Sequence, residues 1–184
     1  MILSFPFCKY IKTAITKFFK FILMKKFLLL FTFLFLNISF GQKITTTYYF
    51  IRHAEKVDNS KNPDLSMKGM ERANHWNKIF AEVDFDLVYA TDFKRTVQTA
   101  SPTATAKKHT IKIYDPKNIA IESFKKETLG KKILIVGHSN TIPHFVNQFI
   151  NQKTYADIED STFGNLYIVT LIGDDISHQI LKLE

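Results

Sequence analysis

The stretch Tyr48-Tyr49-Phe50-Ile51-Arg52-His53-Ala54-Glu55 begins as an apolar run of strand length and ends in a group of polar side chains. Aromatic and β-branched residues favour a strand over its first four positions. Two further runs of this kind follow, at 85–90 and at 133–136. The first leads through a short polar stretch to Arg95, and the second leads directly to Gly137 and His138.

Segments with helical spacing separate these runs. Ser66 is predicted to cap a helix whose inner face carries Met70, Ala73, Trp76 and Phe80. A second helix is predicted over 93–107, although Pro102 should end it early or kink it. An edge strand at 111–114, a short helix or turn at 121–129 and a helix at 143–150 follow. The chain is predicted to close with a hairpin of strands 166–172 and 176–183, joined by a turn at Gly173-Asp174-Asp175. The alternation predicts one α/β domain of three layers, with a mainly parallel central sheet flanked by helices.

In sheets of this class, ligands bind beyond the carboxyl ends of the strands. Arg52, His53, Arg95 and His138 all follow predicted strands and should therefore meet at one edge. Two arginines that converge repel each other unless an anion lies between them, and guanidinium groups match the oxygens of phosphate. A neutral imidazole beside them is a competent nucleophile. Phosphoryl transfer needs mainly positioning and charge stabilisation, so this set predicts a site that works without a metal.

Four segments, at 49–56, 65–73, 89–100 and 136–141, resemble in order those of the histidine phosphatase superfamily, in a small, compact branch. Arg52-His53-Ala54 is similar to the Arg-His-Gly signature in its Arg-His-Ala variant. The resemblance spans about residues 48 to 170 and implies a phosphoglycerate mutase-like fold without a cofactor. It implies that His53 is the phosphohistidine nucleophile and that Arg52, Arg95 and His138 bind and stabilise the phosphoryl group. The expected activity is hydrolysis of phosphomonoesters.

The general acid is the least defined part of this resemblance. Many relatives carry a glutamate within a long insertion after the third strand, where this chain has only a short stretch. Asp115 is the first candidate because it ends the predicted strand, and Glu122 and Glu55 are alternatives. Ser139, not an aspartate, follows the second histidine, unlike the larger branch of the superfamily.

Other functions use the same residues. A mutase-type phosphotransferase would share the first half-reaction, and a non-catalytic phosphate-binding module would share the anion site. The stretch 137–141 also resembles the Gly-x-Ser-x-Gly turn of α/β-hydrolases, with Ser139 as nucleophile, although Thr141 replaces the last glycine. A metal site built from His53, His138 and Asp92 is disfavoured, because the spacing is wrong and two arginines would repel a cation.

Charge is distributed unevenly along the 184 residues. Residues 1–41 carry six lysines and no acid, whereas 42–184 carry 19 basic and 17 acidic side chains. The net charge of +8 therefore belongs mostly to the first segment, and it gives no reason to expect nucleic acid as a partner. The expected partner is a small phosphorylated substrate, and the oligomeric state stays open.

The first 41 residues are predicted to be a signal peptide. Met24-Lys25-Lys26 is a positive start, 27–36 is apolar, and 37–41 supplies small residues for cleavage near Gly41. Met24 is an alternative start of translation, and an uncleaved anchor over 11–36 is the alternative to cleavage. We expect a periplasmic or secreted phosphatase domain, 42–184, with no stable membrane association after cleavage. Its lack of cysteine excludes a disulfide, because Cys8 lies in the leader.

Overall fold

The computed structural model describes residues 7–36 and 43–183, and the chain divides into two compact units, Met1–Gln42 and Lys43–Glu184. The first unit contains helix α1 (Phe7–Leu36). Over the described ranges, no helix combines the length and the apolar character that crossing a membrane requires. The predicted cleavage point near Gly41 lies outside the described residues, so the signal peptide stays a prediction.

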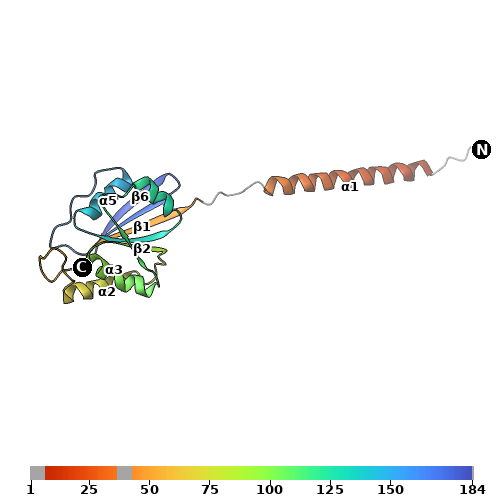
Figure 1. The fold of residues 1–184 in the computed structure, drawn as a ribbon. Coiled ribbons are helices and arrows are strands. Elements are labelled where there is room, and N and C mark those ends of the chain that lie inside the picture. The colour runs from red at the N-terminus through yellow and green to blue at the C-terminus, as the bar shows by residue number, and fades with distance from the viewer. Residues whose placement is uncertain (1–6, 37–42, 184) are drawn as a thin grey trace, which may run out of the picture. The chain divides into compact units, whose positions relative to one another are not determined.

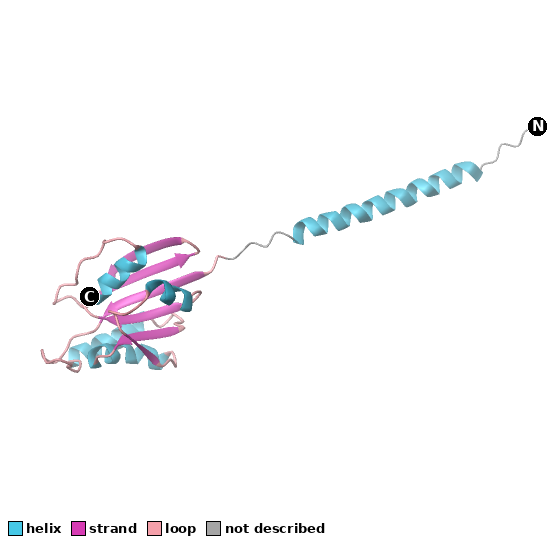
Figure 2. Cartoon of the chain, turned by 45° about the horizontal axis from the view of Figure 1, so that its top comes forward, coloured by secondary structure: helices cyan, strands magenta, loops and turns pink. Residues whose placement is uncertain are grey.

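The second unit is built on a six-stranded sheet with the order β3-β2-β4-β1-β5-β6 (Figure 2). Strands β3, β2, β4 and β1 are parallel, β5 is antiparallel to β1, and β6 is antiparallel to β5. The strand bounds are β1 (Thr45–Arg52), β2 (Leu87–Thr91), β3 (Ile111–Tyr114), β4 (Lys132–Gly137), β5 (Asn165–Ile172) and β6 (Asp175–Lys182). The predicted hairpin and the central, fully covered strand are both confirmed.

Helices cover the two faces of this sheet, and the predicted three-layer α/β architecture is confirmed (Figure 1). Helices α2 (Met67–Ile79) and α3 (Lys94–Ala106) lie together on one face. The short helix α4 (Ile121–Glu127) and α5 (Thr141–Ile150) lie on the other.

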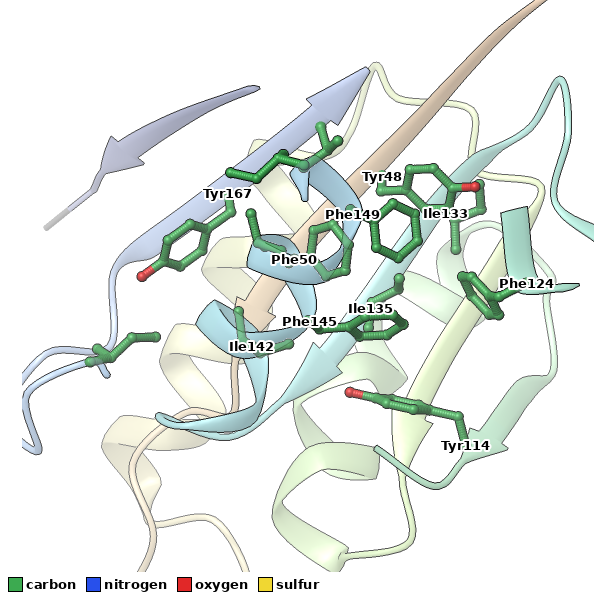
Figure 3. Packing of buried hydrophobic residues seen from close by; sticks show 14 residues of the cluster. Tyr48, Phe50, Tyr114, Phe124, Ile133, Ile135, Ile142, Phe145, Phe149 and Tyr167 are labelled. Carbon is green, nitrogen blue, oxygen red and sulfur yellow. The ribbon is translucent and has the colours of Figure 1, made fainter. Parts of the chain in front are cut away.

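Alternate residues of each strand point to opposite faces, so β1 contributes to two separate cores. On the α4–α5 face, Tyr48 and Phe50 pack against Phe145 and Phe149, with ring centroids 4.5 Å apart for Tyr48–Phe149 and 5.4 Å for Phe50–Phe145 (Figure 3). On the α2–α3 face, Ile51 lies in a cluster with Trp76, Phe80, Val88 and Val136, all of them buried. Burial of both faces fixes the strand register that places the site.

The structure corrects two details of the helices. Met70 is 51% exposed, and Gly69 takes the inner position predicted for it. At Gly69 the helix approaches the loop after β1 so closely that a Cβ would lie 2.1 Å from the carbonyl oxygen of Glu55, which leaves no room for a methionine. Ser66 does cap α2, since its hydroxyl accepts a hydrogen bond from the Gly69 N–H at 3.0 Å.

Helix α3 does not end at Pro102 but runs through it to Ala106. Proline removes one helical hydrogen bond. The buried face of α3, formed by Thr96, Thr99, Ala100, Thr103 and Ala104, keeps the helix packed on the sheet past this point. Packing therefore outweighs the local preference of proline.

Candidate active site

The carboxyl ends of β1, β2 and β4 bring the four predicted residues to one cavity of about 600 Å³. Arg52 is paired with Gly137 across β1 and β4, and the backbone N–H of His53 donates to the Gly137 carbonyl at 2.8 Å. His138 is the next residue, and its ring centroid lies 5.4 Å from that of His53. Arg95 approaches from the first turn of α3, with a guanidinium nitrogen 3.4 Å from Nδ1 of His138. The topology therefore unites the four residues as predicted.

The hydrogen bond of His53 defines which ring nitrogen can react. Its Nδ1 lies 2.8 Å from the carbonyl oxygen of Ala54, which can only accept, so Nδ1 carries the proton and Nε2 keeps its lone pair. His53 is 5% exposed. The pKa of His53 is lowered to about 4, mainly by burial and to a smaller extent by the charges of Arg95 and Arg52. The hydrogen bond to Ala54 acts in the opposite direction and raises this pKa, but it is outweighed by burial. At neutral pH the ring is uncharged, with a free nitrogen.

His138 is also neutral in the free protein. Burial, followed by the positive charge of Arg95, lowers its pKa to about 3. Its Nε2 lies 2.9 Å from Oγ1 of Thr91, and its Nδ1 faces Arg95. A bound dianion would offset the positive charge and favour a proton on Nδ1, from which the ring could donate to an anion oxygen.

Arg52 is held rigidly by the loop between α5 and β5. It is 4% exposed, and Nη1 donates to the carbonyl oxygens of Glu159, Asp160 and Thr162 at 2.8, 3.1 and 2.9 Å. Its Nη2 lies 3.6 Å from the carboxylate of Asp160, and its Cζ lies 4.3 Å from the centroid of the Phe163 ring. The buried Nε has no hydrogen-bond partner in the described part of the chain, so the guanidinium keeps unused donor capacity.

Positive charge exceeds negative charge around the cavity. Arg95 packs over the ring of Phe93, with Cζ 4.4 Å from the centroid, and makes no ion pair with any described acid. The other lining residues are Lys56, Asn59, Pro116, Lys117, Ser139, Asn140, Thr141, Asp160 and Phe163, together with Phe93. Four cationic side chains thus face one carboxylate, that of Asp160, which suits an anionic ligand.

None of the three predicted general acids lines this cavity. Asp115 is exposed and closes a turn, accepting from the Lys117 N–H and the Asn118 amide, and these hydrogen bonds lower its pKa. Glu122 pairs with Lys125 on α4 at 3.0 Å. Glu55 accepts two hydrogen bonds from Nε of Arg72 and one from its Nη2, so it holds the loop after β1 against α2. Asp115 directly follows β3, as expected, but its carboxylate holds a turn and does not line the cavity.

Ser139 lines the cavity, but within residues 43–183 no hydrogen bond joins its hydroxyl to a histidine. His178 is bonded to Tyr155, and His144 lines a separate hollow with Asn147 and Tyr155. A serine nucleophile would thus lack a base. The described residues also include no cluster of three or more His, Cys, Asp or Glu side chains placed to hold a metal ion.

Sequence reasoning missed several residues of the site. Lys56 and Asn59 line the cavity, and their position a few residues after His53 is the sequence signal that could have identified them. Asp160 and Phe163 had no such signal, because they belong to an irregular loop that has no periodicity or motif. Only the fold shows that this loop wraps Arg52.

The chain was compared with protein families and with curated sequences. The family model of the histidine phosphatase superfamily (branch 1) matches residues 48–116. A comparison with curated protein sequences gives no match.

Several solved structures share the fold. A putative alpha-ribazole-5'-P phosphatase from Escherichia coli is 14% identical with a TM-score of 0.62, covering 75% of this chain and 96% of its own. A phosphoglycerate mutase from Bacillus anthracis is 12% identical with a TM-score of 0.61, covering 77% and 94%. The protein histidine phosphatase SixA, complexed with tungstate, is 12% identical with a TM-score of 0.59, covering 74% and 96%.

The fold is thus that of the phosphoglycerate mutase-like α/β proteins, and two arginines and two histidines share its strand-end cavity. The family match includes three of the four signature segments, so over residues 48–116 the chain is similar to the histidine phosphatase superfamily, whose members are phosphatases or mutases.

Proposed function

We propose that this protein is a metal-independent phosphatase that hydrolyses phosphomonoesters through a phosphohistidine on His53. The observation that carries the proposal is the state of His53. Its Nδ1 proton is committed to the Ala54 carbonyl, and its unprotonated Nε2 belongs to a buried ring in a cavity with two arginines. Such a ring is a nucleophile matched to a phosphate dianion.

In the first step, Nε2 of His53 attacks phosphorus, the bond to the ester oxygen breaks, and the alcohol leaves with a proton. Arg52, Arg95 and protonated His138 bind the phosphoryl oxygens and offset their charge in the transition state. In the second step, water attacks the same phosphorus, the P–N bond breaks, and phosphate leaves with His53 restored. No metal or other cofactor takes part in either step.

The leaving oxygen needs a proton donor, and we assign this role to Asp160 in place of Asp115. Asp160 carries the one carboxylate among the described cavity-lining residues. Its Oδ1 lies 3.6 Å from Nη2 of Arg52, beside the predicted phosphate site. The same carboxylate would then take a proton from the attacking water in the second step.

The mutase alternative needs a pocket that retains the product for rephosphorylation. The connection between β3 and α4, where such a pocket could be built, contains only residues 115–120. The cavity is therefore bordered there by just Pro116 and Lys117, which favours release of the product and transfer to water.

Turnover tests the proposal. We expect the protein to release phosphate from a panel of monoesters in the presence of EDTA, and His53→Gln to abolish this release. His75→Gln, a change on the exposed side of α2, is the control and should retain full activity. Activity that needs an added metal, or that survives in His53→Gln, would refute the proposal, and binding of tungstate without any turnover would indicate a phosphate-binding module.

We also propose that the enzyme is exported to the periplasm or the medium, with a small phosphorylated molecule as its partner. The support is the lysine-flanked apolar segment before Asn37 and the near-neutral charge of the following domain. In a fractionated culture, the N-terminus of the mature protein should lie near Gln42. A cytoplasmic protein that keeps residues 1–41 would contradict this.

A further inference from the structure

We infer that Thr91 and Thr96 are positioning residues that fix the proton of His138 on Nε2 and leave Nδ1 for the phosphoryl group. The inference rests on the proposed function for its catalytic consequence, but the tautomer itself can be observed without turnover. Thr91 is the last residue of β2, and Thr96 belongs to the first turn of α3. Both are buried, with 1% and 0% of their surface exposed.

The direction of the hydrogen bonds follows from counting protons. The hydroxyl of Thr96 lies 2.8 Å from the carbonyl oxygens of both Thr91 and Phe93, which can only accept, so its single proton points to them. The contact of 3.0 Å between the two threonine hydroxyls must therefore use the proton of Thr91. With that proton committed, Thr91 Oγ1 can only accept from the ring of His138, at 2.9 Å.

The chain of donors thus runs from Nε2–H of His138 through Thr91 and Thr96 to backbone carbonyls. A neutral imidazole has one N–H, so Nδ1 of His138 is left bare and faces the Arg95 guanidinium at 3.4 Å. When a dianion binds, its negative charge favours uptake of a second proton from solvent at Nδ1, and Nε2 keeps its hydrogen bond to Thr91. The first turn of α3 therefore determines the surroundings of both ring nitrogens of His138. Arg95 faces Nδ1, and Thr96 acts on Nε2 through Thr91.

Thr96→Val is the direct test, because valine keeps the shape and removes the hydroxyl. Without its acceptor, the Thr91 hydroxyl is free to donate to Nε2, which favours the wrong tautomer and a weaker imidazolium. Thr103→Val is a matched control, since Thr103 is a buried threonine of the same helix whose hydroxyl has no partner among the described residues. Thr96→Ser restores the hydroxyl and should restore the wild-type behaviour.

The primary readout is the ¹⁵N chemical shifts of the His138 ring in the free protein. We expect the Nε2–H tautomer in the wild type, Thr103→Val and Thr96→Ser, and a loss of that tautomer in Thr96→Val. Thr96→Val should also lower kcat/KM about tenfold, because a weaker imidazolium stabilises the phosphoryl oxygens less in the transition state. It should move the decline of tungstate affinity with rising pH to a lower pH. An Nδ1–H tautomer in the wild type, or Thr96→Val indistinguishable from Thr103→Val in all three measurements, would overturn the inference. A wild type without turnover but with the expected tautomers would refute the proposed function and leave the positioning intact.

Discussion

At the scale of single residues, the site is defined by where protons and charges lie before substrate arrives. His53 and His138 are both neutral, because burial and the neighbouring arginines disfavour a third and fourth positive charge. Arg52 commits Nη1 to three backbone carbonyls, whereas its buried Nε has no hydrogen-bond partner among the described residues. A bound dianion would balance the charges of the arginines. It would favour a second proton on His138, whereas His53 would stay neutral with its Nδ1 proton donated to Ala54.

The role of Asp160 is testable through the leaving group. A poor leaving group such as an alkyl alcohol depends on a proton donor, whereas p-nitrophenolate leaves without one. We expect Asp160→Asn to lower kcat for alkyl phosphates by at least about a hundredfold and to affect p-nitrophenyl phosphate much less.

Asp115→Asn is the matched control, since it makes the same chemical change at a carboxylate outside the cavity. Its kcat should stay close to the wild-type value for both classes of substrate. Equal losses for the two substrates in Asp160→Asn, or the larger loss in Asp115→Asn, would contradict the assignment of Asp160.

At the scale of elements, the loop after β1 is held by the start of α2. Gly69 lies against the Glu55 backbone, and Arg72 binds the Glu55 carboxylate with its Nη2 2.8 Å from Oε1. The loop is also tied to α3, because the Ala54 N–H donates to the hydroxyl of Thr99 at 2.9 Å. These contacts fix the carbonyl of Ala54 that orients His53.

Gly69→Ala should therefore destabilise the domain and disturb the site together. The new Cβ would overlap the Glu55 carbonyl and force α2 and the loop apart, at a cost of about 1–3 kcal/mol. Urea denaturation followed by circular dichroism measures the free energy of unfolding. Glu71→Ala, at an exposed position of the same helix, should change it little, and equal stability of the two variants would disprove this close packing.

At the scale of the whole molecule, hydrophobic periodicity was enough to predict the elements of the sheet, their order along the chain and the strand-end position of the site. It could not show which side chains a loop would carry into the cavity. Asp160 and Phe163 are placed by the return of the chain from α5 to β5, a long-range event without a local signal. The error at Met70 has the same origin, and so does the continuation of α3 through Pro102 over the predicted extent of the helix, since tertiary packing decided both.

Stability should fall as the pH falls below about 6.5, the ordinary pKa of histidine. Because the folded pKa values of His53 and His138 are lowered, the unfolded chain binds more protons between about pH 6.5 and pH 4, and acid favours unfolding there. The loss between about pH 6.5 and pH 5 is on the order of 2 kcal/mol for His53 alone. His53→Gln should lose less stability over this window, and a wild type whose unfolding free energy is flat across it would contradict the pKa directions.

The measurement that tests the central claim most directly is rapid quenching of turnover in alkali, where phosphohistidine survives, followed by mass spectrometry of the peptide that contains His53. The account predicts one phosphoryl group on His53 in the wild type, formed within a single turnover and absent from His53→Gln. A phosphoryl group on Ser139, or burst-free turnover with no phosphorylated peptide at all, would contradict it.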